Sequence, residues 1–121
     1  MRIRFAFALA SALGFTALAA PVMADGMFGA FAFSPSTGQY GWSKNVGDED
    51  GATTQAITGC GVDDCEMVVV FPSCAALSVG DGFGMGFSKA KSVEKSEETA
   101  LQRCDEFTTN CIVSASLCND E

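Results

Sequence analysis

The chain has 121 residues, a formal net charge of −8 at pH 7 and no histidine. This acidity disfavours binding to nucleic acid and to anionic membrane surfaces, because like charges repel. Without histidine the protein has no Ser-His-Asp or Cys-His catalytic machinery.

The first 24 residues have the pattern of a secretory signal peptide. Arg2 and Arg4 precede an apolar segment at 5–20, and residues 22–24 offer small side chains at the positions that signal peptidase reads. An uncleaved anchor is less favoured, because the apolar segment is shorter than a membrane span and Pro21 follows it. We therefore expect cleavage near Ala24 and a periplasmic or secreted mature protein without a membrane anchor.

The mature chain is predicted to hold a short lead-in at 25–28 and one domain at 29–119. Its five remaining basic residues stand against fifteen acidic ones, a net charge near −10. Within the domain, GWSK at 41–44 aligns with GFSK at 86–89, and three cysteines follow each stretch in the same order. Such self-similarity predicts two copies of one supersecondary unit, repeat one at 29–74 and repeat two at 75–119.

The first repeat opens on a predicted hairpin whose turn, Pro-Ser-Thr-Gly, occupies 35–38. Asp48 is the predicted N-cap of a helix, and the glycines at 59 and 61 suit its C-terminus. A strand at 66–71 follows, and its continuous apolar run predicts a central strand that is covered on both faces. The inward positions of the helix are predicted to be Ala52, Ala56, Ile57 and Cys60.

The second repeat is predicted to have a hairpin with its turn at 80–82, a helix with Ser92 as N-cap and a strand at 112–117. Glycines at 82, 84 and 86 alternate with Phe83, Met85 and Phe87, which leaves one strand face bare. We expect a neighbouring part of the chain to cover that face. The inward helix positions are predicted to be Val93, Ala100, Leu101 and Cys104.

These elements predict an α+β fold in which two ββαβ-like repeats form one largely antiparallel sheet with two helices, stapled by disulfides. Six cysteines in a short exported chain indicate three bridges, and the absence of histidine and of any C-x2-C pair disfavours zinc binding. Strand length separates Cys65 from Cys74 and Cys111 from Cys118 beyond bridging distance. The favoured pairs are Cys60–Cys65, Cys104–Cys111 and Cys74–Cys118, the last joining the two repeats.

The Ser-Pro-Ser-Thr-Gly turn at 34–38, the Gly-aromatic hairpins and the order of the cysteines resemble the bacterial family known as domain of unknown function 4189. The resemblance covers residues 29–119. It implies a short, exported, cysteine-rich protein, and it implies no reaction, ligand or catalytic residue.

Aromatic side chains are the candidate binding surface, although most of them are expected to line the core. Tyr40 and Trp42 lie on the same side of one predicted strand and therefore share one environment. Exposure of this pair together with Phe83 would favour a surface for a sugar or a peptide. The aromatic set comprises Phe28, Phe31, Phe33, Tyr40, Trp42, Phe83 and Phe87.

The sequence is best interpreted as a non-catalytic binding module whose partner is an envelope protein, a peptide or a glycan, with no cofactor. One alternative is a carboxylate-based hydrolase of envelope polymers, using Asp63/Asp64 or Glu97/Glu98. Another is a calcium-binding accessory protein, using the acidic stretches at 48–51 or 62–66, which lack the EF-hand alternation. Both are less favoured, because adjacent acids usually lie on a solvated surface.

Overall fold

The computed structural model describes residues 26–120, so the predicted signal peptide and its cleavage site lie outside the described residues. Two ββαβ units follow one another along the chain, joined by the link Pro72–Ser73. The first unit consists of β1 (Phe28–Phe33), β2 (Tyr40–Val46), α1 (Glu49–Cys60) and β3 (Glu66–Phe71). The second unit consists of β4 (Cys74–Val79), the 3-10 turn η1 (Asp81–Phe83), β5 (Met85–Ala90), α2 (Val93–Asp105) and β6 (Ile112–Cys118).

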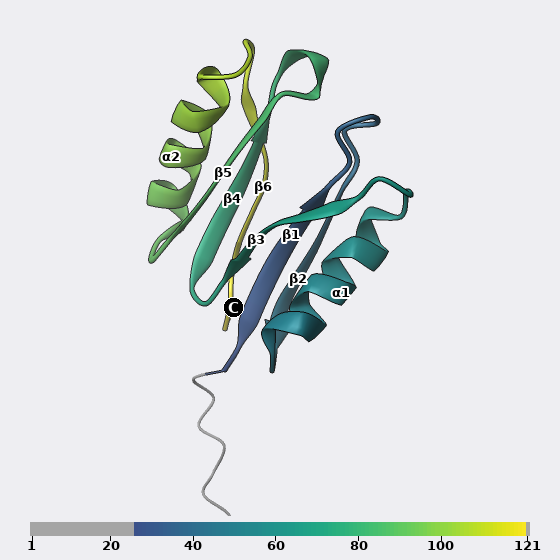
Figure 1. The fold of residues 1–121 in the computed structure, drawn as a ribbon. Helices are drawn as coiled ribbons and strands as arrows, with labels where there is room; N and C mark the ends of the chain where they lie inside the picture. Colours follow the sequence, from purple (N-terminus) through teal and green to yellow (C-terminus); the bar gives the residue numbers. More distant parts are fainter. Residues whose placement is uncertain (1–25, 121) are drawn as a thin grey trace, which may run out of the picture.

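The strands form two separate antiparallel sheets, in the orders β2-β1-β3 and β5-β4-β6. The two sheets face each other, with α1 on the outer face of one and α2 on the outer face of the other (Figure 1). The α+β class, the antiparallel pairing and the disulfide stapling are therefore confirmed, but the single continuous sheet is wrong. Each sheet has two faces to bury, and it buries one against its own helix and the other against the second sheet.

The side chains of β1 show why the sheets stack. Phe31 and Phe33 enter the core between the sheets, whereas Ala30 and Ala32 pack against α1. Large side chains thus fill the space between the sheets, and small ones let the helix approach closely. The ring centroids of Phe31 and Phe71 lie 5.6 Å apart in this core. The buried residues of the inter-sheet core are Phe31, Phe33, Val69, Phe71, Ala75 and Leu77.

The strand at 66–71 has the predicted bounds but lies at the edge of its sheet, so its expected central place is wrong. The central strand of that sheet is β1. The apolar run of β3 has another cause, because Val69 faces the second sheet while Val70 packs against the α1 side. At the start of the strand, Met67 is 44% exposed.

Glycine allows each helix to approach its sheet. A side chain at Gly41 would overlap the Ala56 carbonyl oxygen and the Cys60 amide nitrogen of α1. A side chain at Gly86 would overlap the corresponding backbone atoms of Ala100 and Cys104 in α2. Of the three glycines on the predicted bare face, Gly86 is therefore covered by α2, where backbone approaches backbone, whereas Gly82 faces open space.

The same hairpin departs from prediction at Phe83, which belongs to η1 rather than to a strand. Beside it, Thr108 from the segment after α2 covers Gly84. The predicted inward helix positions are mostly buried, but Ile57 is 38% exposed on the outer side of α1. In α2 the buried residues include Ser96, whose hydroxyl donates to the Ser92 carbonyl. That bond allows a polar residue to occupy a core position.

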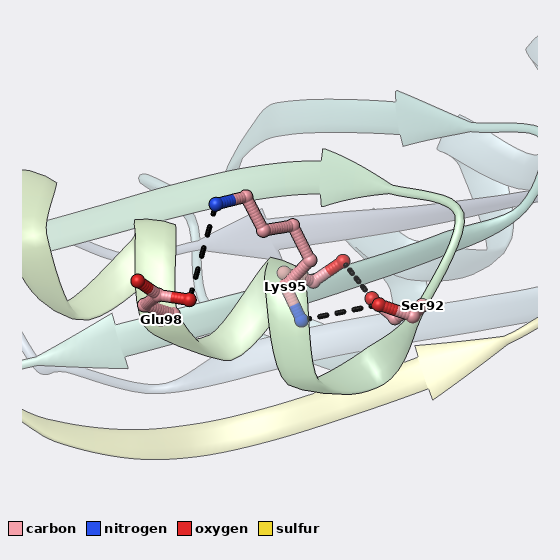
Figure 2. A network of polar contacts seen from close by, with 4 residues as sticks. Ser92, Lys95 and Glu98 are labelled. Atoms are coloured by element: carbon pink, nitrogen blue, oxygen red, sulfur yellow. Dashed lines mark hydrogen bonds and ion pairs between the residues drawn. The ribbon is translucent and has the colours of Figure 1, made fainter.

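Both predicted N-caps are confirmed. Asp48 Oδ1 accepts from the Gly51 amide, and Ser92 Oγ accepts from the Lys95 amide at 3.2 Å. Figure 2 shows the second cap together with the ion pair between Lys95 Nζ and Glu98 Oε2, 3.9 Å apart. Because both charged groups are exposed, the caps stabilise the helix start more than this pair does.

The disulfides are Cys60–Cys65, Cys104–Cys111 and Cys74–Cys118, the pairs that the sequence favoured. The first two tie the end of a helix to the following strand. The third does not join the two units, which corrects its expected role, because β4 begins at Cys74 and pairs there with Cys118 of β6. The second unit thus contains two bridges, and side-chain packing and hydrogen bonds hold the units together.

Candidate binding surface

Tyr40 and Trp42 lie on β2, at an edge of the first sheet, and their side chains are on the sheet face that looks toward the second sheet. This orientation follows from the pairing of Tyr40 with Phe33 and of Trp42 with Phe31, since cross-strand partners share a face. Yet Tyr40 is 37% and Trp42 49% exposed. The core between the sheets therefore ends before it reaches β2.

Two contacts align β2 with β6 of the second sheet. Tyr40 Oη donates to the Ser114 carbonyl oxygen at 3.1 Å, and Asn119 Oδ1 accepts from the Asn45 amide at 2.8 Å. The spacing between the two contacts is the same on both strands, so β2 and β6 run in parallel past one another. Trp42 lies between the contacts, where β6 presents Ala115 and Leu117 to the space between the sheets and the Ser116 hydroxyl turns to Glu97 of α2. The indole nevertheless stays half exposed.

Asn119 has a structural role that sequence reasoning missed. It is 8% exposed, its side-chain amide donates to the Phe71 carbonyl, and its own backbone amide donates to the Ser73 carbonyl. Asn45 Oδ1 in turn accepts from the Asp120 amide. One buried asparagine thereby joins the end of β6 to the first unit, and its polar atoms are satisfied within the fold.

Phe83 reaches the same region from the second unit. Its ring lies against Gly38 in the β1–β2 turn, where both the glycine and the phenylalanine have positive φ, 74° and 63°. A positive φ is uncommon for a bulky residue, and here the Gly84 amide bond to the Asp81 carbonyl closes the turn around it. Phe83 is 43% exposed. We refer to Tyr40, Trp42 and Phe83 together as the aromatic surface.

Tyr40 begins β2 directly after the β1–β2 turn and Phe83 belongs to η1, so both lie toward the end of the molecule at which four connections meet, the upper end in Figure 1. We call it the turn end, and it comprises the β1–β2 turn, the α1–β3 loop, the β4–β5 turn with η1, and the α2–β6 loop. The Asp81 amide donates to the Thr109 carbonyl at 2.9 Å, which fixes two of the connections to one another. Phe83 is thus carried by these braced connections, and Tyr40 and Trp42 lie on β2 directly after one of them.

In each unit, one aspartate carboxylate connects the hairpin turn to the loop that follows the helix. In the first, Asp64 from the α1–β3 loop accepts from the Ser34 hydroxyl and from the Ser36 amide. These hydrogen bonds, that from Ser34 first, lower the pKa of Asp64 below its usual value. In the second, Asp81 in the β4–β5 turn accepts from the Thr109 hydroxyl and the Asn110 side-chain amide. Neutral groups donate all four bonds, so these partners add no positive charge beside either carboxylate.

Charge is unevenly distributed over the described residues. The segments 34–40, 61–66, 80–84 and 105–112 around the turn end contain no lysine or arginine. Lys89, Lys91 and Lys95 lie at the opposite end, where β5 leads into α2. Two basic residues border these segments: Lys44 lies two positions after Trp42 on β2, and Arg103 in the last turn of α2 donates to the Phe87 carbonyl oxygen. The acidic residues of the four segments are Asp63, Asp64, Glu66, Asp81, Asp105 and Glu106.

The acid pairs weighed as catalytic groups do not converge. Asp64 is held by the β1–β2 turn whereas Asp63 is exposed, and Glu97 accepts from the Ser116 hydroxyl while Glu98 pairs with Lys95. Within residues 26–120, no group of three or more His, Cys, Asp or Glu side chains is placed to hold a metal ion. The structure therefore offers no observation in favour of the hydrolase or the calcium-binding alternative.

A groove of about 530 Å³ lies at the other end of the molecule, beside the link Pro72–Ser73 and the Cys74–Cys118 bridge. Lys91 shares its lining with Glu94 and Asp120, so neither sign of charge dominates it. A shallower hollow of about 260 Å³ adjoins it along the same link. Neither of them includes a residue of the aromatic surface.

A family model described as "Domain of unknown function (DUF4189)" matches residues 28–118, which include every strand and helix of the two units. The chain belongs to this family. Comparisons with curated proteins and with solved structures gave no match. In the part of the chain that the structure describes, no helix is long and apolar enough to cross a membrane.

Proposed function

We propose that this member of the DUF4189 family is a non-catalytic binding module that works outside the cytoplasm, in the periplasm or the extracellular space. Three disulfides in a domain of this size support that location, because such bridges persist in oxidising compartments. The predicted signal peptide supports it as well. The bridges also supply stability that a small core provides only in part.

The joint exposure of Tyr40, Trp42 and Phe83 is the observation that carries this proposal. Exposed aromatic side chains that lie close together are typical of recognition surfaces, and tryptophan and tyrosine are enriched among residues that dominate binding energy. The tether from Tyr40 Oη to Ser114 restrains the ring before a partner arrives, which lowers the entropic cost of binding.

Capture from an envelope extract with the immobilised, oxidised domain tests the proposal. The wild type is compared with Trp42→Ala and with the control Met67→Ala, which removes a similarly exposed apolar side chain from β3. We expect a reproducible protein, peptide or glycan partner that is retained by the control and lost by Trp42→Ala. A partner set that is the same for all three proteins would contradict the proposal.

A further inference from the structure

The residues around the aromatic surface indicate the chemical class of its partner, an inference that rests on the proposed function. Aromatic faces alone would suit a sugar ring, an apolar side chain or a cation. The surrounding charge distinguishes between them, because the segments named above carry six acidic residues, whereas the basic residues that border them are Lys44 on β2 and Arg103 at the end of α2. We infer that the aromatic surface binds a cationic segment of a partner protein, with lysine or arginine side chains over Tyr40, Trp42 and Phe83.

Two forces favour such a segment. The face of an aromatic ring carries partial negative charge and attracts ammonium and guanidinium groups, most strongly for tryptophan. Carboxylates nearby add a longer-range attraction that speeds the encounter and selects for positive partners. Asp63, Glu66, Asp105 and Glu106 are all exposed, so their charges act through solvent as well as at contact.

The strand geometry specifies the spacing of the cations. Tyr40 and Trp42 are two residues apart on β2, which separates them by about 7 Å along the strand. An extended peptide has the same repeat, so basic side chains at alternate positions can lie over both rings. Phe83 comes from the other unit and widens the surface beyond the strand. A basic segment with alternating lysines therefore fits better than the same lysines in one block.

Competing ligands gain less from this arrangement. A neutral oligosaccharide can stack on the rings but receives nothing from the carboxylates, and an anionic polymer is repelled by them. A second copy of this chain could present Lys89, Lys91 and Lys95 to the turn end. Those lysines lie around the start of α2 among acidic neighbours, Glu94 and Glu98, which weakens that option.

The test uses three synthetic peptides: alternating lysine and threonine, the same residues with the lysines in one block, and alternating glutamate and threonine. Trp42 is the only tryptophan of the chain, so its fluorescence reports directly on the surface. Amide chemical shifts of the oxidised protein locate each contact. We expect saturable binding of the alternating lysine peptide, weaker binding of the block peptide, no binding of the glutamate peptide, and an affinity that falls as salt rises.

Charge variants give a matched comparison. Asp63→Asn, Glu66→Gln and Glu106→Gln together remove three charges at the turn end and should weaken binding of the alternating lysine peptide roughly tenfold. The control combines Glu49→Gln, Asp50→Asn and Glu94→Gln, which removes three charges at the helix starts and should leave the affinity within twofold of the wild type. Phe83→Ala should weaken binding without changing its salt dependence.

The possible failures are distinguishable. No saturable binding of either lysine peptide, or equal weakening by both triple variants, would overturn the inference. Trp42-dependent binding of a neutral oligosaccharide or peptide instead would overturn it while leaving the proposed function intact. Head-to-tail association of the protein that blocks the lysine peptide, detected by sedimentation, would assign the surface to a second copy and likewise overturn it. Lysine-peptide binding that Trp42→Ala and Phe83→Ala leave unchanged would count against both proposals.

Discussion

The edge strands β2 and β5 occupy corresponding places in the two ββαβ units, but their aromatic side chains have different surroundings. Phe87 of β5 packs against the inter-sheet core, which β3 of the facing sheet supplies with valine side chains. Trp42 is its counterpart on β2, where the facing strand β6 presents Ala115 and Leu117 to the space between the sheets and the indole stays half exposed. The same ββαβ arrangement thus packs an aromatic side chain against the core on β5 and leaves its counterpart on β2 exposed.

A second difference concerns the locks at the turn end. Asp64 reaches from the loop after the helix to the hairpin turn, whereas Asp81 reaches from the hairpin turn to the loop after the helix. The carboxylate therefore comes from the loop in the first unit and from the turn in the second, and in both units it connects the turn to the loop. The physical requirement is that each hairpin turn be fixed to the loop beside it, and either segment can supply the acceptor.

A third difference is the additional bridge of the second unit. Cys74 is the first residue of β4, and the first residue of β1 is Phe28, whose side chain packs against the α1 side. An aromatic side chain fills this place in one unit, and a disulfide to Cys118 occupies it in the other. At this position a disulfide therefore joins β4 to β6 in the second unit, whereas side-chain packing holds the start of β1 in the first.

Removing the additional bridge should have the largest effect. Its cysteines are 44 residues apart, against a separation of 5 for Cys60–Cys65. On the chain-entropy model, Cys74→Ala with Cys118→Ala should cost roughly 4 kcal/mol of unfolding free energy, and Cys60→Ala with Cys65→Ala roughly 2 kcal/mol. Urea denaturation measures both. Equal losses for the two double variants would show that loop length does not govern the contribution.

Replacing the two counterpart aromatics should have the next largest effect. Phe87→Ala removes a partly buried ring from the inter-sheet core and should cost roughly 2 kcal/mol. Trp42→Ala removes an exposed ring and should cost less than about 1 kcal/mol. The same denaturation measurement compares them, and a native amide spectrum shows that each variant is folded. If both cost the same, Trp42 is a core residue and the difference between the edges disappears.

Much of this fold is predictable from local sequence signals. Asp48 and Ser92 precede their helices with the cap chemistry that a helix start requires, and Gly86 indicated a close approach that α2 now explains. The division into two sheets was not predictable in this way. Whether β3 lies at the centre or at an edge depends on which strand pairs with β1, and the apolar run of β3 is compatible with either place.

The candidate site was predictable only in part. Alternation placed Tyr40 and Trp42 on one face, but their exposure depends on how β2 packs against β6, more than 70 positions away. The roles of Asn119 and Asp64 rest entirely on such tertiary contacts. Asn119 donates to the Phe71 carbonyl and Asp64 accepts from Ser34, and no spacing in the sequence links either pair.

The smallest predicted effect concerns the Asp64 lock and depends on pH. The pKa of Asp64 is lower in the folded protein than its usual value, because the Ser34 hydroxyl and the Ser36 amide donate to the carboxylate. Such a group stabilises the fold fully at pH values above the ordinary aspartate pKa, and the stabilisation is lost as the pH falls through the lowered value. Asp64→Asn should therefore be less stable than the wild type at neutral pH, and the difference should shrink below about pH 4.

Asp63→Asn is the matched control, because Asp63 is the exposed neighbour of Asp64 and its substitution removes the same charge. We expect its unfolding free energy to follow that of the wild type at every pH. A difference for Asp64→Asn that stays constant from neutral to acidic pH would mean that the carboxylate acts by shape alone. The lock of the first unit would then depend on hydrogen-bond geometry and not on charge, and Asp81→Asn in the second unit should show the same pH-independent loss.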